Sequence, residues 1–136
     1  MRYLHTMIRV TDLAKSLRFY CEGLGFEMVS RQDYPKDRFT LVFLRAPGDK
    51  TLSAEKSPML ELTHNWDTSA YTRGDAYGHM AYAVESIDDV RSKLKRISCD
   101  LSWGPGPTPS GKITMAFIDD PDGYEIELLE HKSSGK

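Results

Sequence analysis

The sequence predicts an α+β fold made of two copies of one unit, in which a strand is followed by a helix and three further strands. Two pairs of segments indicate this repeat. His5–Val10 and His79–Val84 are apolar, strand-like stretches that each begin with a histidine and end with a valine. Near the end of each half, Glu61 and Glu127 alternate with leucine and isoleucine, as residues of a strand with one apolar face do.

Turn signals and periodicity place the elements of the first half. Asp12 is a good N-cap for a helix, and the glycines at positions 23 and 25 are residues that end one. The predicted elements are a strand at Tyr3–Val10, a helix at about Leu13–Glu22, and strands at Phe26–Arg31, Phe39–Arg45 and Pro58–Thr63.

The second half repeats this order. Ser86 and Asp89 form a capping-box pattern at the start of a helix. The predicted elements are a strand at His79–Val84, a helix at about Ile87–Ile97, and strands at Asp100–Trp103, Ile113–Asp119 and Tyr124–Glu130. Gly104–Gly111 is so rich in glycine and proline that we expect an irregular loop there, a candidate lid. We expect one domain over residues 1–131, with modules at about 1–66 and 77–131 and a flexible tail at 132–136.

Composition narrows the function classes. The chain has 136 residues, of which 40% are hydrophobic and 28% charged, as in a folded globular domain. A net charge of −2 gives no electrostatic reason to expect nucleic-acid binding, and no apolar run approaches the roughly 20 residues that cross a bilayer. Cys21 and Cys99 lack the spacing of a metal site or a disulfide framework. We therefore expect a cytoplasmic protein that binds neither membranes nor nucleic acid.

Four residues at equivalent places of the repeat suggest a shared metal site. His5 and His79 begin the two units and Glu61 and Glu127 end them, which gives a mixed nitrogen and oxygen ligand set, each residue expected within a strand. A single histidine or glutamate in a strand is more often structural or solvent-facing, and only the repetition favours ligands. His64 and His131 have no equivalents and are expected to face solvent, while Glu125 shares a strand face with Glu127.

Four segments resemble the glyoxalase I family of the vicinal-oxygen-chelate superfamily, in the family's order and over almost the whole chain. They are His5–Val10, Leu60–Trp66, Tyr77–His79 and Asp120–Glu127. The resemblance implies the paired βαβββ fold of that superfamily and the reaction of a lactoylglutathione lyase, the isomerisation of a methylglyoxal–glutathione hemithioacetal to S-D-lactoylglutathione. The short chain resembles the compact bacterial form, which implies one divalent metal per site, with nickel or cobalt favoured and zinc possible.

The resemblance also implies roles for single residues. His5, Glu61, His79 and Glu127 match the metal ligands, the first two from one protomer of a homodimer and the last two from its partner. The implied substrate contacts are Arg9 and Asn65 at the γ-glutamyl end of glutathione, Gly111 and Lys112 at the glycyl carboxylate, and Arg73. Asp75 departs from relatives that carry an arginine at that place, and Arg73 is the candidate to replace it.

The implied chemistry moves one proton between adjacent carbons through an enediolate bound to the metal. Glu127 is the expected base, with Glu61 able to serve the other substrate epimer, and Glu125 is expected at the rim of the site. Two alternatives remain at this point: another metalloenzyme of the superfamily, such as an epimerase, a thiol transferase or a dioxygenase, and a metal-free protein that sequesters a small molecule.

Overall fold

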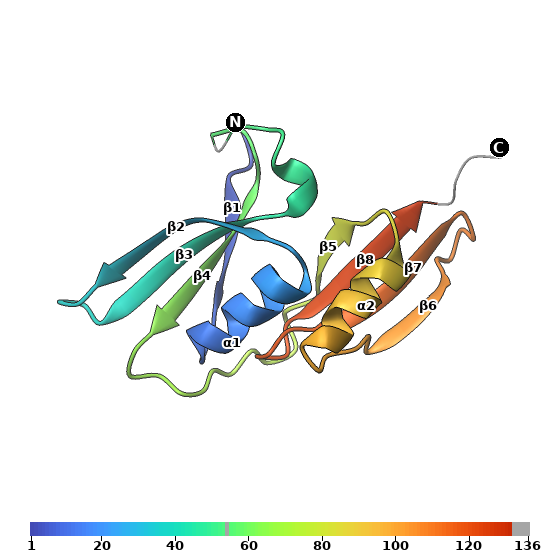
Figure 1. Ribbon diagram of the computed structural model, residues 1–136. Helices are drawn as coiled ribbons and strands as arrows, with labels where there is room; N and C mark the ends of the chain where they lie inside the picture. Colours follow the sequence, from blue (N-terminus) through green and yellow to red (C-terminus); the bar gives the residue numbers. More distant parts are fainter. Residues whose placement is uncertain (54, 132–136) are drawn as a thin grey trace. The chain divides into compact units, whose positions relative to one another are not determined.

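The computed structural model describes residues 1–53 and 55–131, which form two compact units divided between Thr72 and Arg73. Each unit contains one βαβββ module, so the predicted fold class is confirmed (Figure 1). That the two modules make a single domain stays a prediction, and the expected flexible tail lies outside the described residues. Within the described ranges, no helix has both the length and the apolar character needed to cross a membrane.

The first unit is a four-stranded sheet with the strand order β1-β4-β3-β2. β1 and β4 are parallel, which requires a crossover connection, and α1 lies in that connection. The remaining pairs are antiparallel. The strands are β1 (His5–Arg9), β2 (Glu27–Tyr34), β3 (Phe39–Arg45) and β4 (Met59–Asn65).

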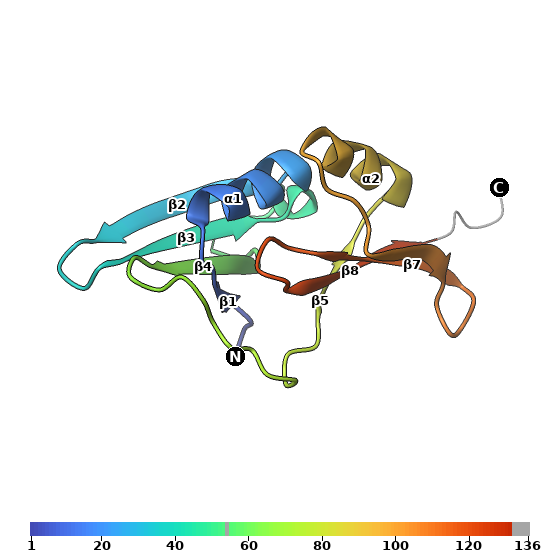
Figure 2. The same ribbon diagram turned by 90° about the horizontal axis from the view of Figure 1, so that it is seen from below.

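The second unit repeats this topology with the order β5-β8-β7-β6, and the pair β5 and β8 is again parallel. Its strands are β5 (Met80–Ala83), β6 (Trp103–Pro107), β7 (Ile113–Asp119) and β8 (Glu125–His131). Viewed from below, each helix lies along one face of the sheet of its own unit (Figure 2). The opposite face of each sheet is left for other contacts.

The helices begin where the capping residues predict. Asp12 accepts a hydrogen bond from the Lys15 amide at 3.1 Å and starts α1 (Leu13–Leu17). The predicted helix continues to position 23, but its second half, η1 (Arg18–Gly23), is a π-helix. This wider turn carries two buried aromatic residues, Phe19 and Tyr20, with 2% and 0% of their surfaces exposed.

α2 (Ile87–Arg96) begins at Ser86, whose hydroxyl accepts from the Asp89 amide at 3.2 Å. A second acceptor is Glu130 of β8, which takes the Ile87 amide hydrogen at 2.8 Å and ties the start of the helix to the sheet. Leu94 is fully buried on the inner face of the helix.

Alternation along the strands divides each sheet into an apolar and a functional face. Leu60 and Leu62 of β4 are buried at 3% and 0% exposure, as are Ile126 and Leu128 of β8 at 0% and 1%. The residues between them, among them Glu61 and Glu127, therefore point to the other face. Each core thus fixes the direction of the carboxylate beside it.

The prediction for the glycine- and proline-rich segment was partly wrong. The strand expected at Asp100–Trp103 begins only at Trp103, and it continues to Pro107 as β6, through residues expected to form the loop. β6 is an edge strand that pairs with β7 alone, and an edge strand tolerates proline because one side of it makes no ladder hydrogen bonds. The irregular loop is shorter than expected, at Thr108–Lys112.

Candidate functional site

The first histidine and carboxylate pair lies on the open face of the first sheet. His5 Nε2 is 3.0 Å from Glu61 Oε1, and the Glu61 side chain is only 12% exposed. Phe43 is the β3 partner of Glu61, and its ring meets the His5 ring edge-on with the centroids 5.2 Å apart. Thr63 donates a hydroxyl hydrogen bond to Glu61 Oε2 at 3.3 Å. The carboxylate is therefore held between an imidazole, an aromatic ring and a hydroxyl.

The second unit repeats the histidine, the carboxylate and the aromatic ring of this arrangement. His79 Nε2 is 3.7 Å from Glu127 Oε1, and the Glu127 side chain is 16% exposed. Phe117 is the β7 partner of Glu127, and its ring meets His79 edge-on at 5.7 Å. The repeat predicted from the sequence thus extends to the aromatic residue beside each pair, which the sequence analysis did not identify.

The histidines lie at the starts of their strands, which corrects the expectation that they lie in mid-strand. His5 is the first residue of β1 and His79 directly precedes β5. Glu61 and Glu127 both lie within their strands, as expected. Glu125 also faces His79, with 3.9 Å between Glu125 Oε1 and His79 Nδ1, but its side chain is 46% exposed.

The two pairs suit a divalent metal in donor type and spacing. Metal bonds of about 2.0–2.2 Å place neighbouring nitrogen and oxygen ligands about 3–3.6 Å apart on one ion. The 3.0 Å pair fits this range and the 3.7 Å pair needs only a small side-chain movement. Among residues 1–53 and 55–131, no three or more His, Cys, Asp or Glu side chains are grouped to hold a metal. Each pair by itself thus offers two side chains of a kind that binds metal.

The expected γ-glutamyl contacts end two neighbouring strands of the first unit. Arg9 is the last residue of β1 and shares a strand face with His5, and Asn65 is the last residue of β4 and shares one with Glu61. The Asn65 amide nitrogen donates to the Tyr71 hydroxyl at 3.0 Å. Tyr71 is a residue that the sequence analysis missed, since it lies in an irregular segment with no motif of its own.

The residues of the second unit that are expected to contact substrate have different surroundings. Gly111 and Lys112 are exposed at the end of the short loop, where Gly111 has φ +71° and the Lys112 amide donates to the Ser110 hydroxyl at 3.3 Å. Arg73 instead donates to the backbone carbonyl of Asp122, and its guanidinium lies 5.2 Å from the centre of the Tyr124 ring. The contacts of Arg73 do not support its expected contact with substrate.

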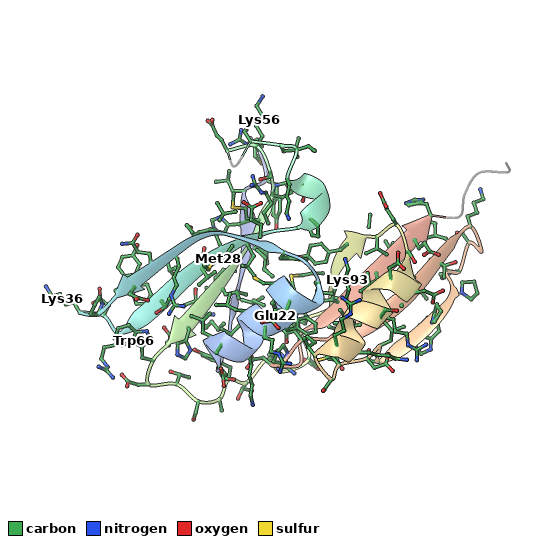
Figure 3. All side chains as sticks on the ribbon, in the orientation of Figure 1. Glu22, Met28, Lys36, Lys56, Trp66 and Lys93 are labelled. Carbon is green, nitrogen blue, oxygen red and sulfur yellow. The ribbon has the colours of Figure 1, made fainter. Side chains whose placement is uncertain are left out.

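His64 is not the solvent-facing residue that the sequence suggested. Its side chain is half-buried, and Nδ1 lies 3.2 Å from the Val10 carbonyl oxygen. It shares a strand face with Leu62 and borders a polar hollow of about 430 Å³ on the helix side of the sheet. Trp66, at the end of β4 (Figure 3), donates to Thr40 there at 2.9 Å. His64 and Trp66 therefore each have a hydrogen-bond partner on the helix side of the sheet, opposite the face that carries Glu61.

Comparisons with known proteins agree with this geometry. The family described as Glyoxalase/Bleomycin resistance protein/Dioxygenase superfamily matches residues 2–128. The chain is 47% identical to the lactoylglutathione lyase of Neisseria meningitidis serogroup A over 133 residues, which are 98% of this chain and 93% of the relative. It is 44% identical to a probable lactoylglutathione lyase of Synechocystis, over 98% of both chains.

Solved structures show the same similarity. The trypanothione-dependent glyoxalase I of Leishmania major has a TM-score of 0.76 and 41% identity, over 96% of this chain and 86% of that one. Glyoxalase I of Zea mays has a TM-score of 0.84 and 30% identity, over 97% of this chain. The match spans only 45% of the maize chain.

Proposed function

Since the chain belongs to the lactoylglutathione lyase family of the Glyoxalase/Bleomycin resistance protein/Dioxygenase superfamily and is an enzyme, we propose that it isomerises the hemithioacetal of methylglyoxal and glutathione to S-D-lactoylglutathione. The observation that carries this proposal is the pair of matching sites, His5 with Glu61 and His79 with Glu127, on the open faces of two equivalent sheets. Methylglyoxal detoxification is the role that this reaction serves.

Four side chains would hold one divalent metal. We propose that His5 and Glu61 of one protomer combine with His79 and Glu127 of a second protomer in a homodimer, since each unit offers two ligands. Imidazole and carboxylate ligands accept nickel, cobalt and zinc. Nickel or cobalt is favoured because the short chain resembles the compact bacterial form. When bound, the metal supplies a Lewis acid that stabilises negative charge on the two adjacent oxygens of the substrate.

Glu127 is the residue that we assign as the base. The reaction removes a proton from the carbon that bears sulfur and returns it to the neighbouring carbon, so one carboxylate must accept and then donate it. Glu61 is steadied by the Thr63 hydroxyl, whereas no described hydroxyl donates to Glu127. With a metal bound, Glu127 would therefore be the carboxylate held less firmly and better able to act as the base, and Glu61 would serve the other epimer.

The substrate contacts that we propose lie at either end of the tripeptide. Arg9 lies four strand residues from His5, a distance of about 13 Å, which matches the reach from the metal to the γ-glutamyl end. Asn65 lies beside it at the end of β4. The loop that carries Gly111 and Lys112 is exposed, and the Lys112 ammonium would receive the glycyl carboxylate, since the Gly111 amide donates to the Thr108 carbonyl at 2.8 Å.

The alternatives are less well supported. Epimerases, thiol transferases and dioxygenases of this superfamily are expected to use a single carboxylate, whereas both carboxylates here lie beside a histidine. A metal-free sequestering protein has no need of either pair. The cytoplasm is the compartment that we propose, because Cys21 and Cys99 are both free thiols and suit a reducing environment.

A metal-reconstitution assay tests the proposal. Apo protein is reloaded in turn with nickel, cobalt, zinc or magnesium, and thioester formation is measured with the methylglyoxal–glutathione hemithioacetal. A parallel arm uses trypanothione as the thiol, since the Leishmania relative depends on it and Asp75 stands where some relatives carry an arginine. Activity with glutathione and nickel or cobalt is expected, and inactivity with every metal and both thiols would overturn the proposed reaction.

A further inference from the structure

The segment that leads into His79 folds back on the turn that opens β8. Arg73 Nη1 donates to the Asp122 carbonyl, and the guanidinium carbon lies 5.2 Å from the centre of the Tyr124 ring. A guanidinium in this position combines a hydrogen bond with a cation–π contact. One side chain therefore reaches both the turn and the residue that follows it.

Tyr77 makes a second connection between the same two segments. Its hydroxyl donates to the Glu125 carbonyl oxygen at 2.9 Å, and its ring meets the Tyr124 ring edge-on at 5.2 Å. Tyr124 is only 8% exposed. The hydrogen bond and the ring contact therefore join the segment before His79 to the start of β8.

The turn itself is built to receive the guanidinium. Asp120 is 4% exposed, and its carboxylate accepts from the amides of Asp122 at 2.9 Å and Tyr124 at 2.8 Å. Gly123 has φ +87°, and a Cβ atom on it would lie 2.8 Å from Arg73 Nη2. Glycine at this position therefore serves both the backbone conformation and the space for Arg73.

We infer that Arg73 and Tyr77 are positioning residues that fix the start of β8 against the segment carrying His79 and so set the separation of His79 from Glu127. The geometry is direct, since Tyr77 precedes His79 by two residues and Glu125 precedes Glu127 by two. The hydrogen bond from Tyr77 to the Glu125 carbonyl thus joins the two segments two residues before each member of the ligand pair. The inference rests on the proposed function, because it assigns these residues to the metal pair of the second unit.

In the part of the chain that the structure describes, the first unit has no equivalent of the contacts that Arg73 and Tyr77 make. Tyr3 precedes His5 by two residues, as Tyr77 precedes His79, but its hydroxyl bonds to Thr6, only three residues along the chain, and Tyr3 is 61% exposed. Glu61 has instead the hydroxyl of Thr63. The two halves of the repeat therefore orient their ligands by different means. The first unit uses a hydrogen bond to the carboxylate itself, and the second uses a hydrogen bond to the backbone of the strand that carries it.

Conservative variants separate positioning from substrate binding. Tyr77→Phe removes only a hydroxyl, and Arg73→Lys keeps the charge while losing the planar fork and its stacking. Arg91→Lys is the matched control, because Arg91 forms a two-point pair with Asp100 on the exposed side of the same unit, with one bond of 2.8 Å. Metal affinity is measured by competition with a chromogenic chelator for nickel, KM at saturating nickel, and folding by circular dichroism and thermal melting.

The expected result is a nickel affinity about three- to tenfold weaker in Tyr77→Phe and about tenfold weaker in Arg73→Lys, while KM at saturating nickel stays within about twofold. Arg91→Lys should leave both values unchanged. Unchanged nickel affinity in folded Tyr77→Phe would overturn the inference. A higher KM with unchanged affinity in Arg73→Lys would make Arg73 a substrate contact instead.

The same experiment distinguishes this inference from the proposed reaction. A wild-type protein that binds none of nickel, cobalt and zinc would overturn both. A wild-type protein that binds nickel but leaves the hemithioacetal unchanged would overturn the reaction alone, because the affinities of the variants would still test the positioning role.

Discussion

Thr63 donates its hydroxyl hydrogen to Glu61 at 3.3 Å, two residues along the same strand. Glu127, the equivalent carboxylate of the second unit, is followed two residues later by Leu129, which has no donor to offer. The two carboxylates of a nearly symmetric site are therefore unequal. This inequality leads to the first of five predictions.

Replacing the two carboxylates should have unequal effects on turnover. Glu127→Gln is expected to lower kcat by at least about a hundredfold, because it removes the base, and Glu61→Gln should cost less. Single-turnover thioester formation at saturating nickel measures both. Glu125→Gln is the control, since that half-exposed side chain is expected at the rim, and near wild-type turnover in Glu127→Gln would exclude it as the base.

Mixing two inactive variants should restore activity if ligands come from both protomers. His5→Ala and His79→Ala each damage both sites of a homodimer, but a mixed dimer contains one site with every ligand intact. Random exchange of protomers should therefore return about a quarter of the wild-type sites. The measurement is thioester formation after the two proteins are unfolded and refolded together. Activity no higher than that of the separate variants would place all four ligands in one chain.

Substrate affinity should depend on Asn65 and, more weakly, on Tyr71. Asn65→Ala is expected to raise KM for the glutathione hemithioacetal about tenfold with little change in kcat, because it removes ground-state binding at the γ-glutamyl end. Tyr71→Phe should raise KM less, since it only frees the Asn65 amide, which donates to Tyr71 at 3.0 Å. Steady-state kinetics with saturating metal measures both, and an unchanged KM in Asn65→Ala would remove the residue from the binding site.

Removing a buried side chain beneath the His5–Glu61 pair should lower the stability of the fold. Leu62 is fully buried beside Glu61, and Leu62→Ala is expected to lower the free energy of unfolding by about 2–5 kcal/mol. Leu52→Ala, at a side chain that is 43% exposed, should change it by less than about 0.5 kcal/mol. Urea unfolding followed by circular dichroism gives both values. Equal losses in the two variants would contradict the burial of Leu62.

One exposed ion pair should contribute stability only above acidic pH. Arg38 donates to Asp67 at 2.6 and 2.8 Å, and this hydrogen bonding lowers the pKa of Asp67. A carboxyl group with a lower pKa in the folded state adds stability above its unfolded pKa, and that stability is lost as the pH falls through the folded pKa. The difference in unfolding free energy between wild type and Asp67→Asn should therefore be small and positive at pH 7 and vanish in acid. A difference that is independent of pH would contradict the lowered pKa of Asp67.

The sequence predicted the fold where local signals and long-range pairing agree. Asp12 and Ser86 cap helices because their side chains satisfy backbone amides without help from the rest of the fold. His5 and Glu61 were found through the repeat, which places them on neighbouring strands of one sheet. Phe43 and Phe117 escaped notice because only strand register shows which residue stands opposite a carboxylate.

The misses have physical causes of the same kind. The contact of Arg73 with Asp122 was not foreseen because a cation in a loop has no local signal of its partner, and this partner is a carbonyl 49 residues away. The strand at Trp103–Pro107 was missed because proline and glycine signal a loop unless the segment lies at the edge of a sheet. His64 is held by the Val10 carbonyl, a contact that depends on the parallel pairing of β1 with β4.

The prolines of β6 also limit how the molecule can meet other chains. Pro105 and Pro107 have no amide hydrogen, so two of the five residues of this edge strand can donate nothing to a strand added alongside it. An open sheet edge is otherwise a template for aggregation through strand pairing. The second sheet is therefore protected on this side against growth into a larger sheet through backbone pairing with another chain.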